Sequence, residues 1–386
     1  MHILAVLPPD RWMEINLLDS LREHYCEELH VFHYPGGMGQ LGSAVWRNKR
    51  DELNNTLLST ARSLHAIGRL DLIFCVVYDD FLLVETAEQL QQLGVPMVNY
   101  HVDMAFQWYR AIRTAPYFDV LAVAQLTNAE HLRPYCRAIH WMPMAANPKF
   151  YYRPIVEPMT PDHIVTFVGS FNPFRRALLE ECVHHGLCPV VFGRGWQSAS
   201  PSPYEFHWDV HKVIHDLRYY AGPRWKAEGP QSVLGPLRRR FARRYSFEDL
   251  SEADLRGPCE DERLPDIFHQ SQVNLGFSDT GWHSGTKIRD SKNLQCRLRD
   301  FEVPMAGGLY LVQEAPDHSQ YYKTGEEIVT WSDPVDFVEK VRFYVRNEKA
   351  ASRIREAGQR RALQEHTWRH RFDQLFDRVR CLRGRA

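Results

Sequence analysis

The dipeptide Gly169-Ser170 stands between an apolar run at residues 164 to 168 and a segment with helical spacing at residues 175 to 185. A strand followed by a turn and a helix leaves backbone N–H groups unpaired where the helix dipole is positive. Both features attract an anion, so Gly169 and Ser170 are predicted to bind a diphosphate. Fixed cations would have to neutralise that group, and the candidates are Arg175, Arg176, Lys287 and Arg289. A lone basic residue is also commonly an exposed, solubilising charge.

His101 and Asp103 follow directly on another apolar run, residues 96 to 100. They are therefore expected at the carboxyl end of a strand. Either side chain could take a proton from a hydroxyl group or orient that group, which makes both catalytic candidates. A histidine close to an aspartate is also commonly a plain hydrogen-bonded pair, and this alternative stays open.

Short apolar runs alternate with helical segments along the chain, which predicts parallel sheets of an α/β protein. In the first half the runs are residues 2–7, 28–34, 70–77, 96–100 and 120–124. In the second half they are residues 164–168, 190–192, 273–277 and 309–312, followed by a helical tail at 335–380. Each run is apolar on both faces, as expected for strands that helices cover on both sides.

The 386 residues are enough for two domains. We place the boundary in the loop rich in proline and aromatic residues before residue 164, which gives an N-terminal domain of residues 1–155 and a C-terminal domain of residues 156–386. Both are expected to be Rossmann-like and to face a central cleft that binds the ligand at the carboxyl ends of the strands. The last part of the helical tail could cross back onto the N-terminal domain.

Residues 197 to 262 have little periodicity and are interpreted as an insertion. Within it, residues 216 to 245 carry a strong excess of positive charge. The cations are Arg218, Arg224, Lys226, Arg238, Arg239, Arg240, Arg243 and Arg244, against Asp216 and Glu228. This basic segment suits a solvated surface, contact with an anionic membrane surface, or contact with nucleic-acid phosphates.

The segment from Arg299 to Gly308, with Glu302 and Gly307 inside it and an apolar run after it, resembles the donor-binding signature of GT-B glycosyltransferases. It is most similar to the CgeB-like, glycosyltransferase family 4-like branch. The resemblance includes residues 168–170 with Arg175 and Arg176, residues 192–196 with Gly193 and Arg194, and residues 325–334 and 364–371. It covers most of the chain apart from the insertion, with a looser match at residues 96–103 and 144–148.

The resemblance implies that Glu302 binds the ribose of a nucleotide-sugar, because a carboxylate can accept hydrogen bonds from both vicinal hydroxyl groups. Gly307 and Gly308 would let the backbone approach the donor, and Lys287 with Arg175 or Arg176 would hold its phosphates. Spacing alone leaves Glu302 open as a solvated helix residue. Asp103 would accept the proton of the acceptor hydroxyl, and His101 would do the same or bind the sugar.

One position departs from the family pattern. Many related retaining enzymes carry a second acid eight residues before this glutamate, and Leu294 stands there. Asp279 or Asp290 could substitute for it. The missing acid is the one hint of a binding module without turnover.

The resemblance therefore predicts a metal-independent glycosyltransferase that moves a sugar from a UDP- or GDP-linked donor to a hydroxyl group of a glycan, lipid-linked sugar, protein or small molecule. The donor is a co-substrate, so no cofactor and no metal site are predicted. The alternatives are a transferase that modifies DNA bases through Arg238 to Arg244, and a nucleotide-sugar-binding module without catalysis.

Composition and motifs exclude several other classes. No apolar run is long enough to span a membrane and no leader pattern opens the chain, so we expect a cytoplasmic protein, with peripheral membrane association open. The eight cysteines show no zinc spacing and are interpreted as reduced thiols. Neither half has G-x-G-x-x-G after its first strand, which argues against a nicotinamide-dependent oxidoreductase.

Overall fold

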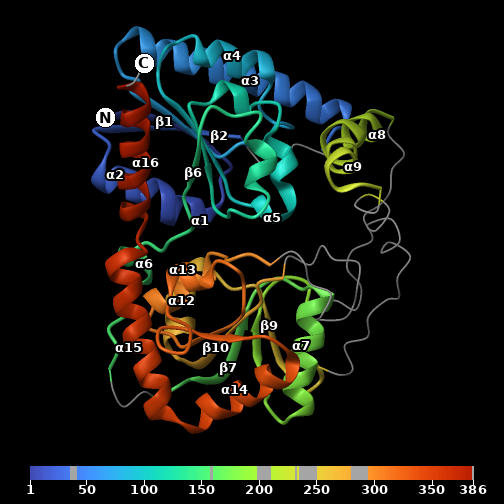
Figure 1. Ribbon diagram of the computed structural model, residues 1–386, viewed down its shortest axis with the longest axis vertical. Helices are drawn as coiled ribbons and strands as arrows, with labels where there is room; N and C mark the ends of the chain where they lie inside the picture. The colour runs from blue at the N-terminus through green and yellow to red at the C-terminus, as the bar shows by residue number, and fades with distance from the viewer. Residues whose placement is uncertain are drawn as a thin grey trace. The chain divides into compact units, whose positions relative to one another are not determined.

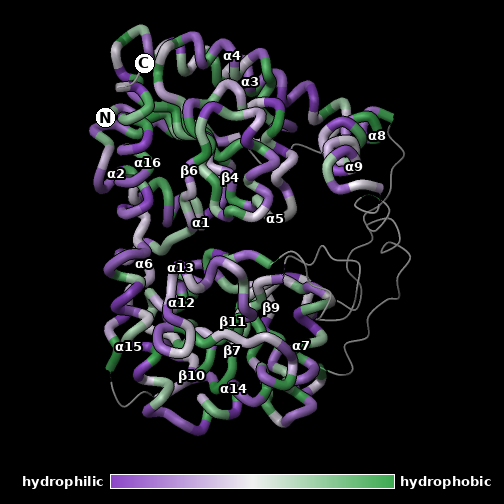
Figure 2. The backbone as a smooth tube through the Cα atoms, in the orientation of Figure 1, coloured by the Kyte–Doolittle hydropathy of each residue, from purple (hydrophilic) through white to green (hydrophobic). Residues whose placement is uncertain are grey.

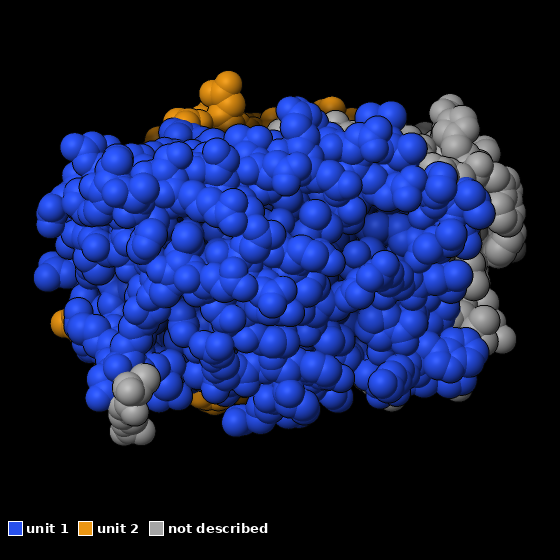
Figure 3. Space-filling view, turned by 90° about the horizontal axis from the view of Figure 1, so that it is seen from above, with its two compact units in different colours: residues 1–143, 205–237, 368–386 blue, residues 144–204, 238–367 orange. Residues whose placement is uncertain are grey.

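The computed structural model describes residues 1–34, 41–156, 160–197, 210–230, 233, 250–279 and 294–384. The chain forms two compact units (Figure 3). Unit 1 consists of Met1–Pro143, Glu205–Leu237 and Trp368–Ala386, and unit 2 of Met144–Tyr204 and Arg238–Thr367. The change of unit after Pro143 comes earlier than the predicted boundary at residue 155, because α6 (Pro148–Tyr151) packs on α11 and α12 of unit 2.

Unit 1 is built on a parallel sheet of six strands in the order β2-β1-β3-β4-β5-β6 (Figure 1). Its strands are β1 (His2–Leu7), β2 (Glu28–His33), β3 (Leu72–Cys75), β4 (Met97–His101), β5 (Val120–Val123) and β6 (Ile139–Trp141). Strands β3, β4 and β5 are buried along their whole length. Such burial on both faces explains why their sequences are continuously apolar.

Helices cover the sheet of unit 1 and supply the rest of its core. They are α1 (Arg11–Met13), η1 (Glu14–Leu18), α2 (Asp19–His24), α3 (Ala44–Ala66), α4 (Val84–Gln91), α5 (Met104–Gln107), η2 (Trp108–Ala111), η3 (Ala115–Tyr117), η4 (Ala129–Leu132) and α16 (Trp368–Arg383). Ser43 caps the start of helix α3, because its hydroxyl accepts the N–H of Trp46 at 3.2 Å. Helix α16 adds the buried Trp368, whose Nε1 donates to Asn16 Oδ1 at 2.9 Å.

A helical segment from the predicted insertion also belongs to unit 1. It comprises α8 (Val210–Asp216), η5 (Leu217–Ala221) and α9 (Gly222–Glu228). Tyr220 donates to Asp80 Oδ2 at 2.9 Å, and Trp108 Nε1 donates to Glu228 Oε1 at 3.0 Å. These contacts attach the segment to residues that follow β3 and β4.

Unit 2 repeats the architecture with a second parallel sheet, in the order β12-β11-β10-β7-β8-β9. Its strands are β7 (His163–Val168), β8 (Val190–Phe192), β9 (Asp254–Gly257), β10 (Ser271–Gly276), β11 (Tyr310–Gln313) and β12 (Val329–Trp331). Strand β9 lies inside the predicted insertion, where the sequence analysis expected no strand. The sequence pattern does not indicate this strand because it is short and polar. It lies at the edge of the sheet and pairs only with β8.

The helices of unit 2 are α6, α7 (Pro173–His184), η7 (Asp261–Arg263), α11 (Leu264–His269), α12 (Arg299–Met305), α13 (His318–Tyr321), α14 (Pro334–Arg346) and α15 (Glu348–Glu365). Helix α7 begins at Asn172, whose side chain accepts the N–H of Phe174 at 2.8 Å. In both units the hydrophobic stretches run along the strands (Figure 2). No helix in the described residues is long and apolar enough to cross a membrane.

Candidate functional site

The turn after β7 and the turn after β8 pack directly against each other in unit 2. The N–H of Gly169 donates to Phe192 O at 2.8 Å, and Trp196 Nε1 donates to Gly169 O at 2.7 Å. Gly193 has φ +154°, and a Cβ built on it would lie 2.0 Å from Gly169 O. Only glycine fits there, and the structure brings Gly169, Ser170 and Gly193 together; their contact with the donor stays a prediction.

Arg175 is the cation of this turn. Its Nη1 donates to Ser170 O at 2.8 Å, and its guanidinium lies 5.7 Å from the ring centre of Phe167. Burial, and then the charge of Arg297, lower the pKa of Arg175 to about 9, so it keeps its proton at pH 7. A protonated guanidinium in these buried surroundings interacts strongly with a phosphate.

The two other predicted basic residues in these turns are placed differently. Arg176 is buried and forms an ion pair with Glu180 one helical turn away, so its charge is already balanced. Arg194 is exposed, and its backbone carbonyl accepts the N–H of Phe171 at 2.8 Å. Lys287 and Arg289, together with Asp290, lie outside the described residues.

Glu302 lies in the first turn of α12 and is fully buried, which excludes the interpretation as a solvated helix residue. It forms an ion pair with Arg299 on the same helix. Burial raises the pKa of Glu302, while Arg299 and a hydrogen bond with Tyr151 oppose that shift. The carboxylate is thus fixed in one orientation by two partners, as a residue that recognises a diol needs to be.

Gly307 and Gly308 meet protein atoms where their side chains would be. A Cβ on Gly307, which has φ +74°, would lie 2.8 Å from Ile155 Cγ1, and one on Gly308 would lie 2.6 Å from Phe268 O. Packing within unit 2 therefore explains both glycines. Contact of Gly307 with the donor stays a prediction.

The structure adds Arg297, a residue that the sequence analysis missed. Its Nη2 donates to Asp279 O at 2.8 Å, and its charge acts on Arg175. Asp279 itself forms an isolated β-bridge with Leu294, the position of the missing acid. The sequence feature that could have drawn attention to Arg297 is its position two residues before Arg299, the first residue of the donor-binding motif.

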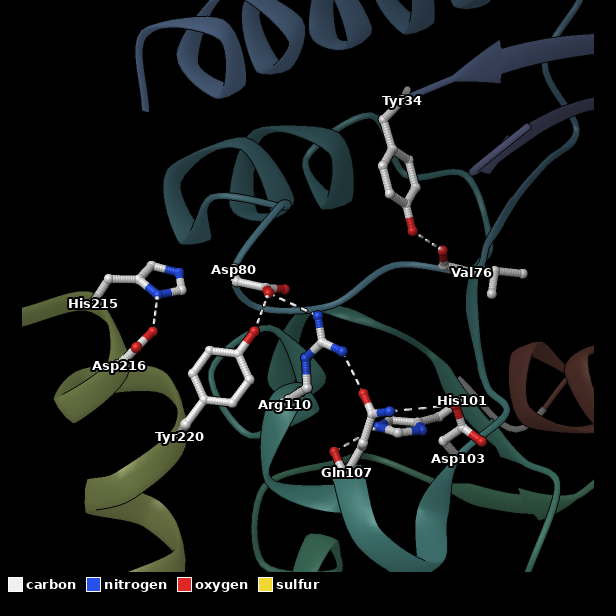
Figure 4. Close-up of polar contacts among 10 residues, drawn as sticks. All are labelled: Tyr34, Val76, Asp80, His101, Asp103, Gln107, Arg110, His215, Asp216 and Tyr220. Atoms are coloured by element: carbon white, nitrogen blue, oxygen red, sulfur yellow. Dashed lines mark hydrogen bonds and ion pairs between the residues drawn. The ribbon is translucent and has the colours of Figure 1, made fainter. Parts of the chain in front are cut away.

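The two catalytic candidates of unit 1 lie close to Gln107 (Figure 4). The His101 ring is fully buried, with its Nε2 at 3.1 Å from Gln107 O. His101 ends β4, as expected, but its ring is part of the core and does not line an open strand end. Asp103 is half-buried and accepts a hydrogen bond from Gln107 Nε2 at 3.4 Å. A catalytic role for Asp103 stays a prediction.

We expect His101 to make unit 1 less stable in acid. Burial, and then the charge of Arg110, lower the pKa of His101 to about 3, whereas an unfolded histidine titrates near 6.5. In this pH range His101 is protonated in the unfolded state and neutral in the folded state. The free energy of unfolding therefore falls as pH drops from about 6.5 toward 3. Denaturant unfolding of wild type and His101→Asn at pH 7, 6 and 5 measures this.

The variant should lose less stability than wild type over that pH range. Equal pH slopes would show that another group causes the acid sensitivity. His24, an exposed histidine at the end of α2, offers the control His24→Asn, which should keep the wild-type slope.

Residues 211–377 match the family model described as glycosyl transferase-like. The whole chain resembles HepE from Anabaena, solved with UDP and glucose, at a TM-score of 0.61 and 10% identity, over 99% of this chain and 100% of that one. Residues 211–377 are thus glycosyl transferase-like, and the chain has the GT-B fold. Sucrose-phosphate synthase from Thermosynechococcus elongatus is also similar, at a TM-score of 0.58 and 11% identity over 100% of both chains. The search of curated proteins gives no match.

The solved structures confirm the predicted fold class, and the family match over residues 211–377 supports the predicted glycosyltransferase class. The family match includes Arg297, Arg299 and Glu302 but begins after Gly169 and Arg175. At the identities above, the solved structures establish the fold alone. The CgeB-like branch stays a prediction.

Proposed function

We propose that this glycosyltransferase moves a sugar from a UDP-linked donor, bound by unit 2, to a hydroxyl group of an acceptor. The observation that carries the proposal is the buried Glu302 carboxylate, fixed by Arg299 and Tyr151 in the same unit as the Gly169–Arg175 turn. The Glu302 carboxylate can bind the ribose, and the turn with Arg175 can bind the phosphates. The fold relative HepE was solved with UDP and with UDP-glucose.

The proposed reaction breaks the bond between the sugar and the diphosphate, and the bonding electron pair leaves with UDP. The acceptor oxygen forms the new bond to the sugar carbon and releases its proton, for which Asp103 is the proposed acceptor. Charge therefore grows on the departing diphosphate. In this proposal Arg175, whose guanidinium contacts the turn before α7 at Ser170 O, stabilises it.

The donor is a co-substrate in this proposal, and no cofactor or metal takes part. Arginine side chains supply the positive charge that a divalent cation supplies in other transferases. Lys287 and Arg289 remain proposed as further donor contacts. Contact of Arg238, Arg239, Arg240, Arg243 and Arg244 with DNA or a membrane surface remains a prediction outside the described residues.

Titration with UDP, GDP, ADP and uridine tests the donor assignment, because UDP should bind most tightly and uridine more weakly. Incubation with UDP-sugars for several hours then tests turnover, since even slow donor hydrolysis releases UDP. Absence of binding to every nucleoside diphosphate would contradict the proposal. Tight binding of UDP with no UDP release, with or without candidate acceptors, would favour a non-catalytic binding module.

We expect activity to survive removal of divalent metal ions. Treatment with EDTA followed by gel filtration should leave the rate of UDP release unchanged, because arginine side chains carry out the charge neutralisation. Adding Mg²⁺ or Mn²⁺ back to the treated enzyme is the control. A loss of activity that either ion restores would show that the metal-free mechanism is wrong.

A further inference from the structure

A buried histidine and aspartate lie behind the loop that carries Arg297. His318 begins α13, Asp300 lies in the first turn of α12, and both side chains are 1% exposed. His318 Nδ1 accepts the backbone N–H of Ala315 at 2.9 Å, while Nε2 contacts Asp300 Oδ1. A ring nitrogen that accepts a hydrogen bond carries no proton, so the ring proton lies on Nε2 and is donated to Asp300.

Asp300, whose carboxylate is oriented by His318, in turn holds Arg297. Its second carboxylate oxygen accepts the backbone N–H of Arg297 at 2.8 Å, and its own N–H donates to Arg297 O at 3.1 Å. The Arg297 side chain is held at its far end, where Nη2 donates to Asp279 O at 2.8 Å. Both ends of this arginine are thus fixed before any ligand binds.

The fixed guanidinium lies close enough to Arg175 to disfavour the charged form of that residue. Burial is the main reason that the pKa of Arg175 is lowered, and the charge of Arg297 lowers it further; Tyr310 and Asp279 compensate only in part. The Nε atoms of Arg175 and Arg297 are both buried, and neither has a hydrogen-bond partner within the described part of the chain. Two like charges held together in this way favour the binding of an anion between them.

We propose that Arg297 is a second phosphate-binding cation for the donor, and that Asp300 and His318 are positioning residues that hold it in place. This rests on the proposed function, because it assumes that the turn around Arg175 receives a diphosphate. Arg297 and Arg175 then bind the phosphates from two different loops, so the diphosphate is held more firmly than by the α7 turn alone.

The same cluster offers a different chemistry that the hydrogen bonds disfavour. Ligand atoms of Cys296, Asp300 and His318 lie within 4.8 Å of one another, close enough to share a metal ion. A metal at His318 Nε2 would require that atom to lose its proton, whereas the N–H of Ala315 keeps the proton there. Burial also raises the pKa of Cys296, which keeps its thiol protonated.

Four variants separate these roles. Arg297→Gln removes the cation. His318→Leu removes both hydrogen bonds of the ring, whereas His318→Gln can still accept from Ala315 and donate to Asp300. Arg346→Gln, at an exposed arginine in the last turn of α14, is the matched control for loss of a positive charge.

Each variant is titrated with UDP and with uridine, which has the base and the ribose but no phosphate. Arg297→Gln and His318→Leu should each weaken UDP binding by about 10- to 100-fold and leave uridine binding unchanged, as expected for a charge-assisted hydrogen bond. The double variant should be no weaker than Arg297→Gln, because His318 acts through Arg297. His318→Gln and Arg346→Gln should stay within about threefold of wild type.

The outcomes separate this inference from the proposed function. If wild type binds no UDP, the proposed function and this inference are both wrong. If wild type binds UDP and Arg297→Gln binds it equally well, the phosphate-binding role of Arg297 is wrong and the proposed function is unaffected. Equal weakening of UDP and uridine by His318→Leu would mean a merely structural role and would also overturn it, as would a stoichiometric metal ion that His318→Leu loses. Should His318→Leu fail to unfold cooperatively, Asp300→Asn takes its place in the same titrations.

Discussion

Replacing Glu302 by glutamine should lower kcat/KM for the UDP-sugar by about 100-fold, because a charge-assisted hydrogen bond contributes about 1.5–3 kcal/mol. The glutamine side chain keeps the size of the glutamate but accepts only one pair of hydrogen bonds and carries no charge. It also leaves the half-buried partner Arg299 without its counter-charge, so the melting temperature should fall as well. Titration with UDP and uridine measures the ribose contribution, since both ligands should lose affinity.

The control is Glu356→Gln, at an exposed glutamate of α15 in the same unit, which should change neither kcat/KM nor the melting temperature. Unchanged uridine binding in Glu302→Gln would show that this carboxylate does not contact the ribose. Loss of UDP binding with uridine binding intact would show that Glu302 affects binding of the phosphates and not of the ribose.

Gly193→Ala is expected to damage the donor site through the backbone alone. The added Cβ would lie 2.0 Å from Gly169 O, so the turns after β7 and β8 must separate. The positive φ of Gly193 adds strain, and together these effects should cost about 2–3 kcal/mol of folding free energy. Because Ser170 and Arg175 are attached to the displaced turn, UDP affinity should also fall by about tenfold or more.

Gly325→Ala is the matched control for Gly193→Ala. Gly325 also has a positive φ, +83°, but a Cβ there would meet no atom within 4 Å. It should therefore lose only about 1 kcal/mol from the backbone conformation and keep its UDP affinity. If the two alanine variants lose the same stability and Gly193→Ala binds UDP normally, the contact between the two turns is unimportant for the donor.

The central strands were predictable from sequence because they are buried on both faces. Strand β8 was expected at residues 190–192, where it lies, and β1 was expected at its observed residues 2–7. Strands β6, β9 and β12 were missed. All three are short, and all three lie at the edge of their sheets.

The candidate site was only partly predictable. Glu302 and Arg175 were found because a local motif marks each of them. The pair of Asp300 and His318 was not, since the two residues meet only after β11 and the loop behind it bring α13 to α12. The burial of His101 also depends on packing, here by Tyr78 and Gln107, that its own strand does not specify.

Unit 1 is assembled from three separate stretches of sequence, and its last stretch is the helix α16. Trp368 and Phe372 of that helix pack on Tyr100 and Phe74 of the sheet. During translation, unit 2 has therefore left the ribosome in full before the N-terminal sheet receives its closing helix. Unit 1 thus begins synthesis before unit 2 but is completed after it. A fragment ending at residue 155 would leave this apolar surface open to water, where a chaperone or another chain can bind it.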